Sequence, residues 1–253
     1  MSGTLTIVGL GPGAPELTTP AVSEALRQAT DLIGYETYMA RVPLIEGQLR
    51  HTSDNRVELD RARQALRLAD EGRRVVVVSS GDPGIFAMAA AVFEAMETGD
   101  AHWRALDVRV EPGVTAMLAA SAMAGAPLGA DFCAVSLSDN LKSWSTIEKR
   151  LVAASNGDFV LALYNPASRS RPHQLARAFE LLLRWRPEST VVIFVRAAGS
   201  NDAKLHITTL AEAATYPADM RTLVIVGSST TRVIHRDGAA PLAYTPRSEG
   251  SRP

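Results

Sequence analysis

The sequence predicts an α/β protein with two α/β domains and mainly parallel sheets, and three observations lead to this fold class. The chain has 253 residues, enough for two modest domains that each bury a core. Short apolar, β-branched runs recur along it, and amphipathic helical patterns lie between several of these runs. Such alternation predicts parallel sheets covered by helices.

Eight apolar runs have the length and composition of strands: residues 5–8, 31–35, 75–78, 108–110, 132–137, 159–164, 191–195 and 222–226. Two helical patterns each place four apolar residues on one face, namely Leu59, Ala62, Leu66 and Ala69, and then Leu175, Phe179, Leu182 and Leu183. Pro20 after Thr19, and Pro172, are expected to open helices. Residues 85–96 are apolar nearly all round, which predicts a buried helix on the first sheet.

A change of character at residues 111–115 marks the expected domain junction, because a strand stops there at Pro112-Gly113 and a run of small residues follows. We therefore predict an N-terminal domain of residues 1–116 and a C-terminal domain of residues 117–238. Residues 239–253 collect Gly, Pro, Ser and Arg, and are expected to form a flexible tail.

Composition limits the classes of function. Lys plus Arg total 26 and Asp plus Glu 27, so no basic field indicates a nucleic-acid partner. No signal peptide pattern and no membrane-spanning stretch of roughly 20 apolar residues is found, so a soluble, cytoplasmic protein without a membrane partner is expected. With one cysteine, Cys133, and dispersed histidines, we expect no protein metal site.

The first segment of chemical interest follows the first strand and reads Gly9-Leu10-Gly11-Pro12-Gly13-Ala14. It has the spacing of a dinucleotide-binding loop, with Asp31 in the place of the ribose acid. However, Pro12 removes an amide hydrogen from the turn that would bind pyrophosphate, and Asp31 falls at the start of its strand. A tight turn that merely needs glycine is a further interpretation.

Three more polar segments follow strands. Gly81-Asp82-Pro83-Gly84 comes after residues 75–78, and Asp82 is either a helix cap or an ionisable group of a site. The segment of residues 112–116 is either a turn that merely opens a helix or part of a site, because the small residues after it would let a flat ligand approach the backbone. After residues 159–164, Asn165-Pro166 forms a turn, and Arg169 and Arg171 either bind carboxylates or are solvated charges.

In this order and spacing, the four segments resemble the tetrapyrrole methylase family, the class III S-adenosylmethionine-dependent methyltransferases, over about residues 5–227. The resemblance implies two α/β domains with the methyl donor, S-adenosylmethionine, in a cleft between them, S-adenosylhomocysteine as product, and a homodimer. It places donor contacts, several through backbone atoms, at Pro12, Ser80, Gly81, Asp82, Ile85, Thr115, Ala116, Asn165, Ala198, Thr222 and Leu223.

Residues 132–141 and 158–171 resemble one branch of the family, which methylates C-17 of a corrin precursor and contracts the macrocycle in cobalamin synthesis. The resemblance implies a small tetrapyrrole as substrate. The sequence leaves open whether that tetrapyrrole is metal-free precorrin-3B or already carries cobalt, as on the early-cobalt route. Another tetrapyrrole methylase and an NAD(P)-dependent oxidoreductase are the alternative activities.

Methyl transfer itself requires mainly alignment and exclusion of water, whereas ring contraction calls for a base near the C-20 hydroxyl. Asp82 and Asp139 are the candidates, with loop capping as the alternative role of Asp139. Substrate contacts are expected at Gly11 and Gly13 of the first loop, and at cations that can hold carboxylates, namely Lys142, Arg169 and Arg171.

Overall fold

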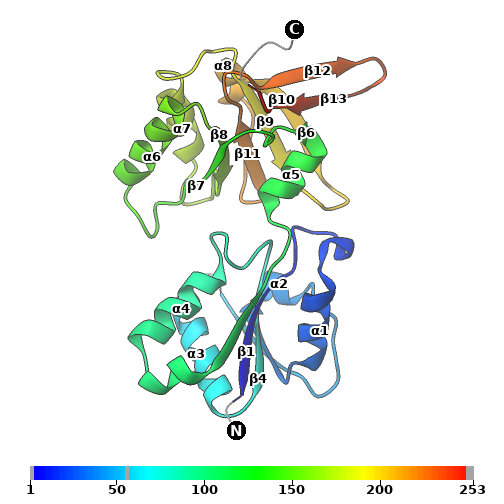
Figure 1. The fold of residues 1–253 in the computed structure, drawn as a ribbon, viewed down its shortest axis with the longest axis vertical. Coiled ribbons are helices and arrows are strands. Elements are labelled where there is room, and N and C mark those ends of the chain that lie inside the picture. The colour runs from blue at the N-terminus through cyan, green and yellow to red at the C-terminus, as the bar shows by residue number, and fades with distance from the viewer. Residues whose placement is uncertain (1–2, 55–56, 249–253) are drawn as a thin grey trace. The chain divides into compact units, whose positions relative to one another are not determined.

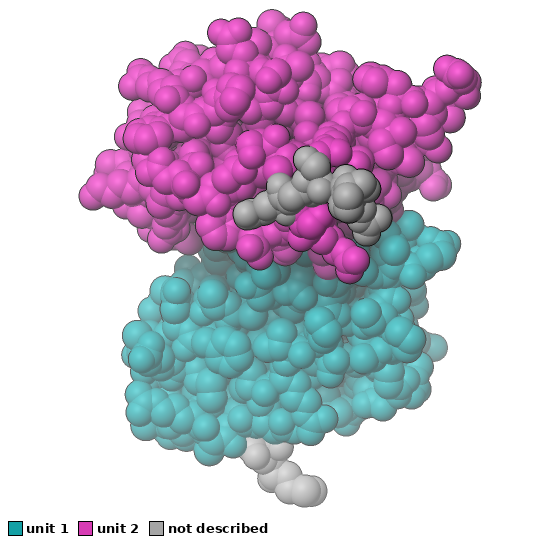
Figure 2. Space-filling view, turned by 45° about the horizontal axis from the view of Figure 1, so that its top comes forward, with its two compact units in different colours: residues 1–115 teal, residues 116–253 magenta. Residues whose placement is uncertain are grey.

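The computed structural model describes residues 3–54 and 57–248, and it divides the chain into two compact units. Unit 1 spans residues 1–115 and unit 2 spans residues 116–253, as the two colours of Figure 2 show. The division falls at Thr115, within the segment where the sequence changes character and one residue before the predicted boundary.

Unit 1 contains one five-stranded sheet and the helices that cover it. Its elements are β1 (Thr4–Gly9), η1 (Pro15–Leu17), α1 (Pro20–Gln28), β2 (Asp31–Tyr35), α2 (Glu36–Met39), β3 (Leu49–Ser53), α3 (Glu58–Asp70), β4 (Arg74–Ser79), α4 (Met88–Thr98), η2 (Ala101–Ala105) and β5 (Asp107–Glu111). The strand order is β3-β2-β4-β1-β5, and every pairing is parallel, as predicted.

Alternate residues of the central strand β4 supply two different cores, because successive side chains of a strand point to opposite faces. Val75 and Val77 pack with α3 and α4, whereas Val76 and Val78 pack with α1 and the region of Met39. In Figure 1, α3 and α4 accordingly lie on one side of β1 and β4, and α1 lies on the other. Both faces of the sheet are therefore covered.

Unit 2 contains a second five-stranded sheet and a smaller one of three strands. Its elements are α5 (Ala116–Ala124), β6 (Gly125–Ala126), β7 (Phe132–Ser136), α6 (Trp144–Asn156), β8 (Val160–Tyr164), α7 (Gln174–Leu182), β9 (Val191–Arg196), β10 (Lys204–Thr209), α8 (Leu210–Ala213), β11 (Thr222–Val226), β12 (Arg232–Arg236) and β13 (Ala239–Tyr244). The sheet orders are β10-β9-β11-β8-β7 and β12-β13-β6.

The prediction of mainly parallel sheets is wrong for the larger sheet of unit 2. Only β7 and β8 pair in parallel, while β11 runs antiparallel to β8 and β9, and β10 runs antiparallel to β9. The cause is β10, a strand that the sequence reasoning missed, which returns along β9 after a short loop and reverses the chain. The crossover through α8 then adds β11 in the same reversed direction.

The predicted flexible tail is also wrong for part of its length. Residues 239–244 form β13, which pairs antiparallel with β12 and parallel with β6. Ala243 is fully buried, and Thr245 donates a hydrogen bond from its hydroxyl to the Pro127 carbonyl at 2.6 Å. Residues 249–253 of the predicted tail lie outside the described residues.

The helix predictions hold with local corrections. Thr19 caps α1 by accepting a hydrogen bond from the Val22 amide, with Pro20 in the first turn. The helix expected at residues 85–96 is α4, which begins later, at Met88, and leaves Phe93 46% exposed, so it is buried on one face only. Pro172 precedes α7 by two residues. Leu59 and Leu183 lie off the buried faces to which they were assigned.

Candidate functional site

The first candidate region lies at the carboxyl edge of the unit 1 sheet. Gly9 in β1 is paired with Ser79 in β4, and Val8 with Glu111 in β5, so the three loops that follow these strands start at one edge. The loops contain the predicted residues Gly11, Pro12, Gly13, Ser80, Gly81, Asp82, Ile85 and Thr115. Ligands of open parallel sheets bind beyond this edge.

Four glycines allow these loops to approach one another closely. A Cβ on Gly113 would lie 2.2 Å from the Gly81 carbonyl oxygen and 2.5 Å from that of Gly9. A Cβ on Gly9 would lie 2.3 Å from the Gly81 oxygen. Gly11 and Gly81, both with positive φ, exchange two backbone hydrogen bonds of 3.1 and 2.9 Å. Glycine is therefore required here by sterics as well as by backbone conformation.

Asp82 ties two of the loops together. One carboxylate oxygen accepts a hydrogen bond from the Gly84 amide at 2.8 Å, as a capping aspartate does. The other oxygen accepts from the Gly113 amide at 3.1 Å, across to the loop after β5. Both oxygens of this predicted donor contact and candidate base are thus engaged by the backbone.

Arg41, which the sequence reasoning missed, contacts the glycine-rich loop from the segment after α2. Its Nη2 donates to the carbonyl oxygens of Leu10 at 2.9 Å and Gly11 at 3.1 Å, and more weakly to that of Gly13 at 3.4 Å. Its Nη1 donates to Ser80 Oγ at 3.3 Å. Burial lowers the pKa of this guanidinium, partly offset by Tyr38. No sequence motif marks an arginine so placed.

The geometry contradicts the dinucleotide alternative. Asp31 is paired with Val75 at the start of β4, so it lies at the amino edge of the sheet, away from the loop after β1. It is fully buried and accepts hydrogen bonds from three side chains: His51 at 2.8 Å, Thr30 at 2.8 Å and Arg73 at 3.0 Å. Burial opposes ionisation, but these bonds outweigh it and lower the pKa of Asp31, which acts as a structural anchor.

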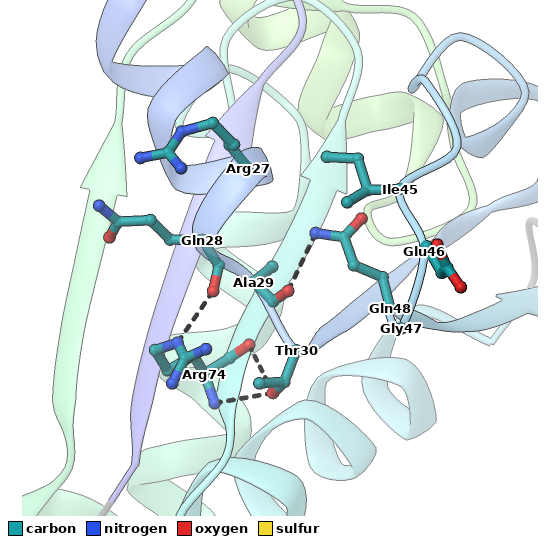
Figure 3. A pocket seen from close by; sticks show the side chains of 9 residues that line it. All are labelled: Arg27, Gln28, Ala29, Thr30, Ile45, Glu46, Gly47, Gln48 and Arg74. Carbon is teal, nitrogen blue, oxygen red and sulfur yellow. Dashed lines mark hydrogen bonds between the residues drawn. The ribbon is translucent and has the colours of Figure 1, made fainter.

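A pocket of about 500 Å³ also lies at this amino edge (Figure 3). The residues that line it are Arg27, Gln28, Ala29, Thr30, Ile45, Glu46, Gly47, Gln48 and Arg74. Its polar groups are largely used within the fold, since Gln48 donates to the Leu26 and Ala29 carbonyls and Arg74 to that of Gln28. None of the predicted site residues lines this pocket.

The second candidate region lies at one edge of the mixed sheet in unit 2. Ser136 at the end of β7 is paired with Tyr164 at the end of β8, and Thr222 at the start of β11 is paired with Arg196 at the end of β9. Because β11 is antiparallel, its first residues lie beside the last residues of its neighbours. Predicted donor contacts from three strands, Asn165, Ala198 and Thr222, therefore lie along one edge.

Local geometry at this edge is unusual for residues with side chains. Asn165 has φ of 52° and Ala197 has φ of 53°, both in the left-handed region that favours glycine. The Asn165 amide nitrogen donates to Ser136 Oγ at 2.9 Å, which fixes its side chain. Strained conformations of this kind concentrate at functional sites. Phe86, next to the predicted donor contact Ile85 in unit 1, has φ of 52° as well.

A network of four charged side chains holds the loop of residues 197–203. Arg196 donates from Nε to Asp219 at 2.8 Å, and Arg221 forms an ion pair with Asp202 at 2.9 Å. The Ser200 hydroxyl and then Arg221 lower the pKa of Asp202 to about 2. For Asp219, burial opposes ionisation, but the Thr222 hydroxyl and Arg196 outweigh it and lower the pKa. The predicted donor contact Thr222 is thus oriented by Asp219, at 2.9 Å.

Asp139 and Lys142 lie in the loop after β7. Asp139 is half-buried and accepts a hydrogen bond from Gln174 Nε2 at 3.3 Å. Burial and the charge of Arg150 lower the pKa of Lys142, whereas Asp139 opposes this shift. The candidate base and one of the candidate cations thus lie in the same loop.

The two arginines predicted to bind carboxylates have different surroundings. Arg169 is exposed on a tight turn closed by two backbone bonds between Ser168 and Arg171. Arg171 is half-buried, and its Nε and Nη1 are buried without a hydrogen-bond partner in the described part of the chain. Its Nη2 lies 4.0 Å from Met220 Sδ. Buried N–H groups without an acceptor are costly, so the two nitrogens distinguish Arg171 from the exposed Arg169.

Two further searches covered the described residues. Across residues 3–54 and 57–248, no three His, Cys, Asp or Glu side chains are grouped as metal ligands would be. No helix in the same residues is long and apolar enough to cross a bilayer.

Comparison with known proteins places these loops in a family. Residues 4–214 match the Tetrapyrrole (Corrin/Porphyrin) Methylases. The chain is 53% identical to a precorrin-3B C(17)-methyltransferase of Sinorhizobium sp, covering 98% of this chain and 97% of that one. It is 43% identical to a probable cobalt-factor III C(17)-methyltransferase of Salmonella typhimurium, covering 96% and 98%.

Among solved structures, the chain resembles that of the methyltransferase CobJ, with a TM-score of 0.91 and 51% sequence identity over 97% of this chain and 100% of that one. The family match covers far more than half of the residues, and the two relatives named above match over nearly their whole length. This chain therefore belongs to the tetrapyrrole methylases.

Proposed function

We propose that this protein transfers a methyl group from S-adenosylmethionine to C-17 of precorrin-3B, with contraction of the macrocycle, in cobalamin synthesis. The observation that carries this proposal is the 53% identity over 98% of the chain to a precorrin-3B C(17)-methyltransferase. Identity to the cobalt-factor III relative is ten percentage points lower, at 43%, which favours the metal-free substrate.

The strand-end residues fit an adenosyl donor. Such a ligand is flat at one end and flexible at the other, and it needs main-chain groups that small side chains leave accessible. Gly81 and Ala198 supply such backbone in units 1 and 2, and Asn165 and Thr222 supply polar side chains whose orientation is fixed by Ser136 and Asp219.

When bound, S-adenosylmethionine supplies a methyl group activated by a sulfonium, which leaves as a neutral thioether. The protein therefore needs mainly to hold donor and acceptor carbon in line and to exclude water. The loops locked by Gly9, Gly81 and Gly113 suit this task, because their close contacts leave little freedom to shift. We assign Gly11 and Gly13 to the wall that faces the tetrapyrrole, as the family resemblance implies.

Ring contraction requires an acceptor for the proton of the C-20 hydroxyl, and Asp139 suits this role better than Asp82. Both oxygens of Asp82 accept backbone hydrogen bonds, which assigns it to holding the loops. Asp139 accepts one hydrogen bond, from Gln174, and lies near Lys142. A carboxylate with remaining acceptor capacity beside a cation can take the hydroxyl proton and return it to solvent.

The substrate is a polycarboxylate, and Arg171 is the cation best prepared for it. Its guanidinium has two nitrogens, Nε and Nη1, without a hydrogen-bond partner in the described residues, and a carboxylate oxygen is the acceptor that a guanidinium favours. Arg169 and Lys142 are assigned to further carboxylates of the same substrate. Removal of Arg171 is expected to raise the KM for the tetrapyrrole more than it changes kcat.

The deciding experiment is an incubation of the purified protein with isotopically labelled S-adenosylmethionine and precorrin-3B. The expected result is one added methyl group and a ring-contracted product by mass spectrometry and absorption spectroscopy. A parallel incubation with cobalt-factor III tests the early-cobalt alternative. Turnover of the cobalt-loaded substrate alone would overturn the proposed substrate, and turnover of neither would overturn the activity.

A further inference from the structure

The Arg41 side chain joins the glycine-rich loop of residues 10–13 to the turn at Ser80. Its guanidinium reaches three carbonyl oxygens of that loop, at 2.9 to 3.4 Å, and a hydroxyl of the turn, at 3.3 Å. A guanidinium carries five N–H donors in a rigid planar fork, so it can fix several acceptors in one plane.

The segment that carries Arg41 is itself anchored. Arg50 donates from Nη1 to the Met39 carbonyl at 3.0 Å and from Nη2 to the Val42 carbonyl at 2.9 Å. Met39 and Val42 are buried in the core of the α1 face. Arg41 therefore projects from a fixed base, and its contacts restrain the loop rather than the reverse.

The loop has few other restraints on its far side. Leu10 is bonded through its amide to Ser79, and Gly11 exchanges two bonds with Gly81, but Pro12 has no amide hydrogen to donate. The Thr18 hydroxyl donates a hydrogen bond to the Leu10 carbonyl at 3.1 Å, so it restrains the same residue as the bond to Ser79. Beyond Gly11, the described hydrogen bond that holds the loop is the one that Arg41 donates to the Gly13 carbonyl.

We infer that Arg41 is a positioning residue for methyl transfer. Its hydrogen bonds to residues 10–13 and to Ser80 hold the tetrapyrrole-facing loop at a fixed distance from the donor-binding turn. This inference rests on the proposed function, because that function gives the loop and the turn their two ligands. Arg41 does not act as an acid or base in this proposal, since its N–H groups donate hydrogen bonds to the backbone.

The test compares Arg41→Ala and Arg41→Lys with a matched control, Arg104→Ala. Arg104 is an exposed arginine of the same unit that donates one hydrogen bond, at 2.8 Å, to the Glu97 carbonyl at the end of α4. For each protein the measurements are kcat and KM for precorrin-3B, the Kd for S-adenosylhomocysteine by calorimetry, the thermal midpoint, and amide hydrogen exchange of residues 10–13.

For Arg41→Ala we expect kcat/KM for the tetrapyrrole to fall about 10-fold to 100-fold, because small displacements of reacting groups are costly. The Kd for S-adenosylhomocysteine should stay within about threefold, since Gly11 and Asp82 still hold the donor turn. Exchange should speed up at Leu10 and Gly11, whose amides donate to Ser79 and Gly81. The kcat/KM of Arg41→Lys should lie between those of Arg41→Ala and the wild type, because an ammonium reaches fewer acceptors than a guanidinium.

Equal kcat/KM for Arg41→Ala and Arg104→Ala would overturn the inference. So would a parallel loss of thermal midpoint, donor affinity and turnover in both Arg41 variants, which is the signature of a merely structural residue. If the wild type methylates neither tetrapyrrole, the proposed function fails, and hydrogen exchange still decides whether Arg41 restrains the loop. Unchanged exchange at Leu10 and Gly11 in Arg41→Ala would contradict that restraint.

Discussion

The two units fix their strand-end loops by different means. In unit 1 the loops after β1, β4 and β5 are locked by backbone contact, because Gly9 and Gly113 lie too close to the Gly81 carbonyl oxygen for either to carry a Cβ. In unit 2 the loop after β9 is held by side chains, through the pairs Arg196–Asp219 and Arg221–Asp202. Backbone contact resists change of sequence, whereas a network of exposed charges tolerates substitution and responds to pH and salt.

The sharpest test of the backbone lock is Gly113→Ala. Gly113 has no positive φ, so the added methyl acts through sterics alone, 2.2 Å from the Gly81 oxygen. We expect a loss of about 4 kcal/mol in the free energy of unfolding, since neither neighbouring backbone can yield cheaply. Urea unfolding measures it.

The control for that change is Gly47→Ala. Gly47 has φ of 83° and nothing within 4 Å of an added Cβ, so only conformational strain of about 1 kcal/mol is expected. Equal losses of unfolding free energy in Gly113→Ala and Gly47→Ala would mean that the loops of unit 1 can move apart. The loops of unit 1 would then not be locked by backbone contact.

The converse test asks whether unit 2 contains a side chain as important as those glycines. Arg186 is buried and donates to the carbonyls of Gly227, Phe159 and Ala154. Arg186→Met should cost about 3 kcal/mol by chemical denaturation, because several buried carbonyls lose their donor. The exposed neighbour is the control, and Arg184→Met should change stability by less than about 0.5 kcal/mol.

Asp82→Asn tests whether the side chain that spans two loops of unit 1 adds to the backbone lock. An asparagine presents one acceptor oxygen, so either Gly84 or Gly113 loses its carboxylate partner. The expected cost is about 1 to 2 kcal/mol in the free energy of unfolding. Asp70→Asn, at an exposed position, should leave the free energy of unfolding unchanged. If Asp82→Asn also leaves it unchanged, the glycines alone hold the loops together.

The smallest effect is expected in the charge network of unit 2, where pH is the informative variable. The pKa of Asp219 is lowered in the folded state, so its contribution is present above the unfolded value, about 3.9, and is lost as pH falls through the folded value. Asp219→Asn should cost less than about 1 kcal/mol at pH 7, since the pair is exposed.

The stability difference between wild type and Asp219→Asn should shrink as pH falls below about 4. Asp202, whose pKa is about 2, should hold Arg221 to lower pH than Asp219 holds Arg196. Denaturation midpoints between pH 2 and pH 7 measure both trends. A difference independent of pH would show that Asp219 acts through packing and not through charge.

Strands differ in how well the sequence predicts them. All eight predicted strands exist, because each is marked by a run of apolar, β-branched residues. Five strands of the described residues were missed: β3, β6, β10, β12 and β13. Of these, β3, β10 and β12 lie at sheet edges and carry polar residues such as Arg50, His206 and Arg232, so no apolar run marks them. Missing β10 also led to the wrong direction for β11.

For the candidate site, glycine and proline spacing identified the loops of unit 1, because a close backbone approach can be met by only one residue type. The side chains that hold these loops escaped prediction. Arg41 and Asp219 are ordinary charged residues in sequence, and only the tertiary fold gives them acceptors and partners. The unpaired guanidinium of Arg171 was predicted to bind carboxylates, but its burial is visible only in the structure.

The position of β11 in unit 2 has a consequence for the order of folding. β8 and β9 are neighbours in sequence but are separated in the sheet by β11, which contributes Thr222–Val226. Until those residues leave the ribosome, the facing edges of two apolar strands have no partner, whereas unit 1 has all its strands once Glu111 is made. During synthesis, unit 2 is therefore the part of this chain that is exposed to misassociation through open strand edges, and that most depends on rapid completion or on chaperones.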